Sequence, residues 1–190
     1  MTAIISFDRV RARLTPVNSL LLLIDAQVGR LWESEFARLR TCLTGLARTA
    51  AARRVPTIVT TSASHEWGPT ISGIGGHADP PIERRVVNPW HEPRIRAAVE
   101  AAGRATLIIA GGALEFSLAP CALSAVDAGY DVYAAIDVSI AADPRRVVRM
   151  FRAGVKVVDP ALVLAELAGD GIATGRSSNR VRTLISGTDG

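Results

Sequence analysis

Cysteine, lysine and aromatic residues are scarce in this chain of 190 residues. Its two cysteines, Cys42 and Cys121, lie in apolar helical patterns, which predicts buried free thiols rather than a disulfide framework. Without such a framework, the cytoplasm is the expected compartment. Lys156 is the single lysine, so arginine is the cation available for nearly every charged role.

Long apolar runs and dense basic runs are also missing. No apolar stretch approaches the roughly 18 residues that a membrane-spanning helix needs, and the segment 1–10 lacks the layout of a signal peptide. The formal net charge is +4 without a clustered basic patch, which argues against nucleic-acid binding. His65 and His77 are too few ligands for a zinc site, so we expect neither a metal nor a cofactor.

The sequence does contain a regular alternation of apolar strand patterns and amphipathic helix patterns. Hydrophobic residues make up 48% of the chain and charged residues 21%, as in ordinary globular proteins. The patterns predict strands at 17–24, 56–61, 105–110, 131–136 and 155–158, and helices at 31–53, 93–102, 115–128, 144–152 and 160–168. This order predicts an α/β fold, with three α/β/α layers around a parallel sheet of five or six strands.

The same patterns predict one domain over residues 1–190, with a core at about 15–168 and a polar tail at 169–190. The segment 62–81 is rich in Gly, Ser and Pro, and its length indicates a functional loop. In sheets of this kind, ligands bind beyond the carboxyl ends of the strands. Residues at those ends are therefore the first candidates for chemistry.

Asp25 directly follows the first strand pattern. A carboxylate removed from water at that position suits acid–base catalysis, although the same residue can cap a helix or lie solvated in a loop. Glu115 and Ser117 open the helix after the third strand, where free N–H groups favour anions; their alternative role is to cap that helix. The turn before them, Gly112 and Ala113, is a candidate source of backbone N–H groups aimed into the site.

Two arginines, Arg84 and Arg85, precede the segment 86–90. One of them is expected over the same sheet edge, against the alternative of an ordinary surface position. Trp67 and Trp90 are the expected apolar walls of a substrate pocket, unless they belong to the core.

Several of these segments resemble a known family. L-L-L-L-I-D-A-Q at 20–27 and I-I-A-G-G-A-L-E-F-S-L-A-P-C-A-L-S-A at 108–125 are similar to the aspartate and nucleophile motifs of the isochorismatase-like (cysteine hydrolase) superfamily. P-T-I-V-T-T-S at 56–62, and V-V-N-P-W at 86–90 after I-E-R-R, resemble its YcaC-like branch. The resemblance spans about residues 15–168. It implies a parallel α/β fold, hydrolase activity on a small molecule and a homo-oligomer.

The resemblance also implies a triad of aspartate, cation and cysteine. It assigns the aspartate to Asp25 and the cation to Arg84, with Arg85 as the alternative. The cysteine position is Ser117. Gln27 of the first motif is a substrate-binding residue by the same resemblance, and a cis peptide is implied between residues 112 and 113. Neither Lys156 nor Cys121 matches a motif position.

Serine at position 117 leaves three functions open, because a hydroxyl is far harder to ionise than a thiol. The first is an enzyme without a cysteine nucleophile, in which Asp25 is the acid–base, Arg84 binds an anionic or carbonyl group and Ser117 hydrogen-bonds substrate or water. The second is a hydrolase with Ser117 as a covalent nucleophile. The third is a non-catalytic binding or assembly protein. Leu114 also departs from the motif, which favours natural divergence over one engineered Cys→Ser change.

Overall fold

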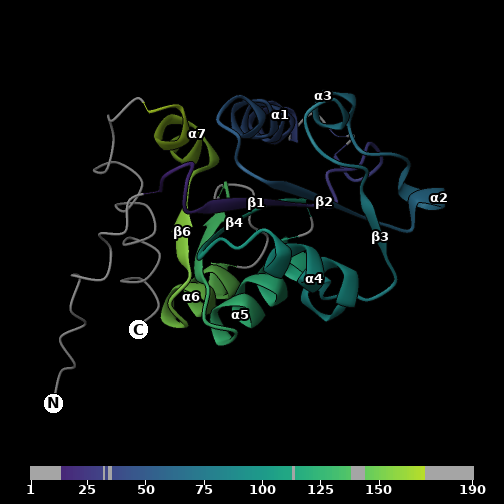
Figure 1. Cartoon of the computed structure of the whole chain (residues 1–190). Helices are drawn as coiled ribbons and strands as arrows, with labels where there is room; N and C mark the ends of the chain where they lie inside the picture. Colours follow the sequence, from purple (N-terminus) through teal and green to yellow (C-terminus); the bar gives the residue numbers. More distant parts are fainter. Residues whose placement is uncertain (1–13, 32, 34–35, 113, 138–143, 170–190) are drawn as a thin grey trace, which may run out of the picture.

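The described part of the chain is built on a sheet of six parallel strands (Figure 1). The computed structural model describes residues 14–31, 33, 36–112, 114–137 and 144–169. The spatial order of the strands is β3-β2-β1-β4-β5-β6. Their bounds are β1 Ser19–Ile24, β2 Thr57–Ser62, β3 Ile82–Arg84, β4 Thr106–Gly111, β5 Asp131–Ala135 and β6 Lys156–Val158. The chain runs outward from β1 to β3 and then returns to place β4 on the other side of β1. The ends of β1 and β4 therefore form the switch point where sheets of this type bind ligands.

Helices cover both faces of this sheet (Figure 1). One face carries α1 Ala37–Ala52, α3 Ser72–Gly75 and α7 Pro160–Ala168. The other carries α4 Pro93–Ala101, α5 Ala119–Asp127 and α6 Pro144–Arg152. The three-layer α/β/α fold predicted from the sequence is confirmed, and the sheet has six strands.

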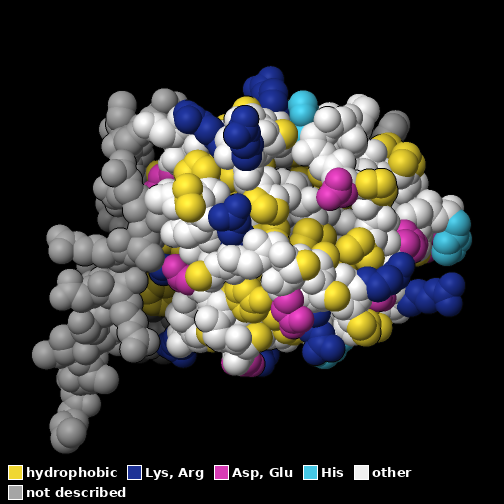
Figure 2. All heavy atoms as spheres, viewed as in Figure 1, with side chains coloured by type: hydrophobic (Ala, Val, Ile, Leu, Met, Phe, Trp, Pro, Cys, Tyr) yellow, Lys and Arg dark blue, Asp and Glu magenta, His cyan; other side chains and the backbone are white. Residues whose placement is uncertain are grey.

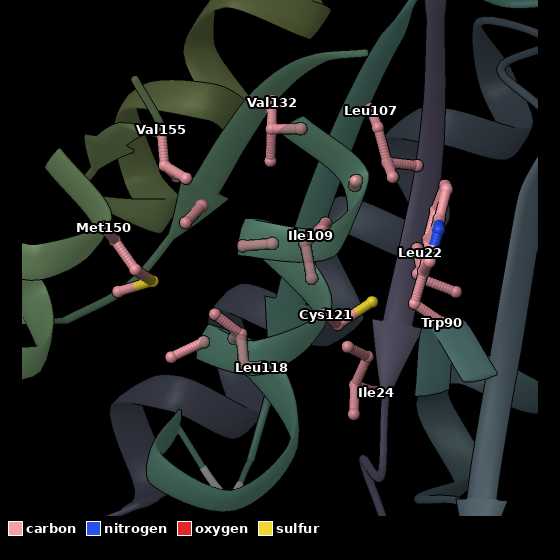
Figure 3. Close-up of a cluster of buried hydrophobic side chains, with 14 of the residues drawn as sticks. Leu22, Ile24, Trp90, Leu107, Ile109, Leu118, Cys121, Val132, Met150 and Val155 are labelled. Atoms are coloured by element: carbon pink, nitrogen blue, oxygen red, sulfur yellow. The ribbon is translucent and has the colours of Figure 1, made fainter. Parts of the chain in front are cut away.

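The continuous apolar run of β1 follows from burial on both of its faces. Side chains alternate along a strand, so successive residues enter different layers. Leu22 and Ile24 pack against α4 and α5, whereas Leu21 and Leu23 pack against α1 and α7. Figure 3 shows the first layer, where Leu22 and its neighbours on β4 and β5 face the side chains of α5 and α6.

The structure differs from the sequence prediction mainly at short elements. β3 was not predicted, because three residues are too few to show an alternating pattern. The predicted loop at 62–81 contains two four-residue helices, α2 Ser64–Trp67 and α3. Helix α1 begins at Ala37 rather than at Leu31. Leu31 is buried and belongs instead to a turn, in which its N–H donates to the carbonyl of Gln27.

Candidate active site

Asp25 lies directly after β1, at the switch point of the sheet. Its backbone has a φ of 50°, in the left-handed region, and so turns the chain sharply at the end of the strand. Its N–H donates to the carbonyl of Thr60 (3.1 Å). Gly111, at the end of β4, allows this strand to approach the end of β1 closely, because a Cβ at position 111 would collide with the backbone of Ile24. The Asp25 side chain is consequently fully buried.

The buried carboxylate of Asp25 is surrounded by donors. Thr60 Oγ1 donates to Oδ1 (3.3 Å) and Ser62 Oγ donates to Oδ2 (3.0 Å), both from the neighbouring strand β2. Arg84 Nη2 also donates to Oδ2 and forms an ion pair with it. The charge of Asp25 is therefore compensated inside the protein rather than by water.

Arg84 is the last residue of β3, and its guanidinium joins the separate parts of the site. Its Nη2 donates to Ser117 Oγ (2.7 Å) as well as to Asp25. Its Nη1 donates to the carbonyls of Val86 and Val87, which fix the orientation of the side chain. Arg84 is only 4% exposed and is paired with Asp25, whereas Arg85 is exposed, so Arg84 is the one of these two candidates that the structure brings to the site.

Ser117 reaches Arg84 from a π-helical turn, η4 Leu114–Leu118, which links β4 to α5. Such turns hold one residue more than an α-helical turn and are frequent at functional sites. Ser117 is buried, while its neighbour Phe116 is 67% exposed. The turn thus points the hydroxyl inward and leaves the phenyl ring at the surface.

The described surroundings of Ser117 do not match those of an activated serine nucleophile. Such a nucleophile needs a base within hydrogen-bond reach. Among the described residues, Ser117 instead accepts a hydrogen bond from a guanidinium, which is a donor and carries positive charge. His65, His77 and His91 are all exposed, whereas Ser117 is buried.

Cys121 does not supply a nucleophilic thiol to this site. It lies one helical turn beyond Ser117, but its side chain is fully buried in the layer between the sheet and α5 (Figure 3). Burial raises the pKa of the Cys121 thiol to about 12, although the nearby charge of Arg84 opposes this shift. The thiol therefore stays protonated and non-nucleophilic at neutral pH.

Gln27, expected as a substrate-binding residue, is fully buried and is bonded to the protein itself. Its Nε2 donates to the carbonyl of Gly68 (2.8 Å), and its Oε1 accepts from the N–H of Ser62 (3.0 Å). Its backbone forms an isolated antiparallel bridge with Thr70. These bonds fasten the segment after β2 to the end of β1.

The other expected binding residues lie in different surroundings. Trp67 is half-buried and stacks against Arg30, whereas Trp90 is in the core, with its ring edge-on to Tyr130 at 5.4 Å. Gly112 is buried, and its N–H donates to the carbonyl of Ile24 (3.1 Å). Ala113, its peptide bond to Gly112 and the side chain of Glu115 lie outside the described residues.

Arg30 was not identified from the sequence, although it faces the carboxylate of Asp25. Its Nη2 donates to Ser62 Oγ (3.0 Å), and its Nε lies 3.9 Å from Asp25 Oδ2. Its guanidinium carbon lies 4.5 Å from the centre of the Trp67 ring. The sequence signal was weak, since an isolated arginine six residues after the end of a strand is usually a surface residue.

The described residues give less support to a metal site, a membrane-spanning helix or a basic surface patch. No three His, Cys, Asp or Glu side chains among them are grouped to hold a metal ion. None of the helices that the structure describes is long and apolar enough to cross a membrane. On the face drawn in Figure 2, the described Lys and Arg side chains are scattered rather than gathered in one patch.

Comparisons with known proteins identify the family. The model of the isochorismatase domain matches residues 19–159. The curated protein "Probable hydrolase YcaC" of Escherichia coli is 33% identical over 134 residues, which are 67% of this chain and 64% of that protein. The chain thus matches somewhat less than two thirds of this relative's length.

Two solved structures have the same fold and are similar in sequence. YcaC from Pseudomonas aeruginosa, with hexane-2,5-diol and covalent acrylamide, has a TM-score of 0.75 and 29% identity, covering 84% of this chain and 85% of that one. The YcaC gene product of Escherichia coli, described as an octameric hydrolase of unknown specificity, has a TM-score of 0.74 and 30% identity, covering 92% and 90%. The buried site at the end of β1 therefore lies in a protein that belongs to the isochorismatase domain family, in its YcaC-like branch.

Proposed function

We propose that this chain is an isochorismatase-family hydrolase that acts on a small molecule without a cysteine nucleophile. The observation that carries the proposal is the bridge made by Arg84 Nη2, which donates to both Asp25 and Ser117. This bridge supports a role for Asp25 as the acid–base group, with Ser117 as a hydrogen-bonding partner. The YcaC-like relatives support hydrolysis as the reaction class.

In this scheme Asp25 takes a proton from a water molecule, whose oxygen attacks the scissile carbon, and later returns the proton to the leaving group. Arg84 holds the carboxylate in place and balances its charge while the proton is transferred. The Ser117 oxygen accepts a hydrogen bond from Arg84, so the Ser117 O–H can donate to the substrate or to water. Thr60 and Ser62 fix the orientation of the carboxylate.

The experiment compares two substitutions on a panel of small amides, esters and enol ethers. Asp25→Asn is expected to reduce turnover by about 10²–10⁴-fold, the usual contribution of general acid–base catalysis. Ser117→Ala is expected to retain measurable turnover, and mass spectrometry of the wild-type protein should show no acyl group on Ser117. An acyl adduct on Ser117 would instead establish covalent catalysis by the hydroxyl. Turnover unaffected by Asp25→Asn would remove Asp25 from the mechanism.

We further propose that the protein works as a cytoplasmic homo-oligomer. The octameric state described for the Escherichia coli relative supports the assembly, and the two free cysteines suit a reducing compartment. Native mass spectrometry of the purified chain tests the assembly directly, and a monomer at micromolar concentration would contradict it.

A further inference from the structure

We infer that Arg30 is a second substrate-binding cation of this site, and that the substrates are small molecules carrying a carboxylate group. This inference rests on the proposed function, because it concerns the group that Asp25 would act beside. It goes beyond that proposal by naming the chemical class that the site selects.

The balance of charge around Asp25 is the first argument. Arg30 and Arg84 both face this carboxylate, with N···O contacts of 3.9 Å for Arg30 and a direct ion pair for Arg84. One carboxylate is thus matched by two guanidinium groups, which leaves these three side chains with one excess positive charge. Glu83 does not remove this excess, because it precedes Arg84 on β3 and bonds instead to Thr61 and Ser64.

Unused hydrogen-bond donors are the second argument. The Nε atoms of Arg30 and Arg84 are both buried, and neither has a hydrogen-bond partner in the part of the chain that the structure describes; Arg30 Nε lies 3.9 Å from Asp25 Oδ2, beyond hydrogen-bond distance. A buried N–H without an acceptor costs free energy, and a charged acceptor recovers the most. A carboxylate is such an acceptor, and its two oxygens suit guanidinium donors.

The way Arg30 is held is the third argument. Its guanidinium stacks on the Trp67 ring and its Nη2 is bonded to Ser62, so its position is fixed before any ligand binds. Gly29 makes the stacking possible: its N–H donates to the Trp67 carbonyl (2.8 Å), and a Cβ there would come within 2.9 Å of the same oxygen. The Arg30 side chain is still 24% exposed, unlike that of Arg84, so a ligand can reach it from solvent.

Calorimetric titration of the full chain with benzoate and with benzamide tests the inference. These probes have similar shapes and differ in charge. Benzoate is expected to bind at least about tenfold more tightly than benzamide to the wild-type protein, since hydrogen bonds to charged groups are the stronger ones. Arg30→Gln is expected to remove this preference while leaving benzamide affinity within about twofold. The exposed Arg85 provides the matched control, and Arg85→Gln should leave both affinities unchanged.

Arg30→Lys keeps the positive charge, so it distinguishes the effect of losing that charge from a folding defect in Arg30→Gln. It is expected to retain an intermediate preference for benzoate that weakens as salt is added. Equal binding of the two probes by the wild-type protein, or a benzoate preference that survives in Arg30→Gln, would overturn the inference.

The outcomes also separate this inference from the proposed function. Asp25-dependent hydrolysis of neutral substrates, with no advantage for anionic ones, would overturn the role of Arg30 alone. Arg30-dependent binding of benzoate, in a protein without Asp25-dependent turnover of any substrate, would overturn the proposed function alone.

Discussion

Arg84 and Asp25 form an ion pair in which the two side chains are 4% and 0% exposed. Their residues come from the ends of two strands separated in the sheet by β2. Since charges removed from water are stable only when they are paired, each of these side chains depends on the other.

Removal of Arg84 is expected to destabilise the protein strongly. Arg84→Met leaves the Asp25 carboxylate buried beside one more distant cation, and breaking a buried pair in this way costs about 3–5 kcal/mol. Urea unfolding measures the loss. The double variant Asp25→Asn/Arg84→Met should lose clearly less than the two single losses combined, because it removes both charges of the buried pair together. Arg85→Met, one residue away and exposed, should stay within about 0.5 kcal/mol of the wild-type protein. Equal losses at positions 84 and 85 would show that the pair contributes nothing.

A thiol introduced at position 117 is expected to be reactive. In Ser117→Cys the sulfur would lie beside the Arg84 guanidinium, which favours the thiolate. Acrylamide is covalently bound in the Pseudomonas aeruginosa relative, so it serves as the probe. Peptide mapping after exposure in mildly alkaline buffer should find acrylamide on residue 117 of the variant.

Ser124→Cys is the matched control for that experiment. Ser124 is half-buried on the following helix and is bonded to the uncharged Asn88 (3.0 Å), so a thiol there would lie beside a neutral amide instead of a guanidinium. It should react more slowly than the thiol introduced at position 117, and Cys121 should remain unmodified in the folded protein. Equal labelling at positions 117 and 124 would mean that Arg84 does not activate a sulfur.

The Cys121 thiol is expected to make stability fall in alkaline solution. Its pKa is raised by burial to about 12, from an ordinary value of 9.0, so the unfolded chain releases this proton first. The stabilisation is complete below pH 9.0 and is lost as pH rises from 9.0 toward about 12. The loss approaches about 1.4 kcal/mol per pH unit within that window.

Comparison with Cys121→Ala isolates this contribution from other groups that titrate in alkali. The variant is less stable near neutral pH because it leaves a cavity. Urea unfolding at about pH 8 and about pH 10 should show its deficit shrinking by about 1 kcal/mol. Parallel stability curves for the two proteins would mean that Cys121 ionises as easily in the folded state as in the unfolded chain.

The sheet was predictable because its central strands are buried on both faces, so the leucines of β1 and the isoleucines of β4 stand out as unbroken apolar runs. The parallel order then placed the strand ends, and with them Asp25, at one edge. Arg30 was not predictable in this way. Its contacts come from Ser62 and Trp67, both far along the chain from it, and no local pattern reports where such side chains meet.

Gln27 and Trp90 illustrate a second limit. Gln27 follows a strand and Trp90 precedes a helix, and both positions are typical of binding residues. Gln27 is nevertheless bonded to Gly68 and Ser62, and Trp90 packs in the core. Chain position alone does not show whether a polar atom is already satisfied by the protein.

The π-helical turn at Leu114–Leu118 sets a constraint on length rather than on composition. Each residue of an α-helix rotates its side chain by about 100° around the axis. Deleting one residue from this turn would restore ordinary helical spacing and swing the hydroxyl of Ser117 away from the Arg84 guanidinium, with every amino acid of the site still present. Any search for homologous enzymes or redesigned variants should therefore treat a gap in this segment as equivalent to losing the residue itself.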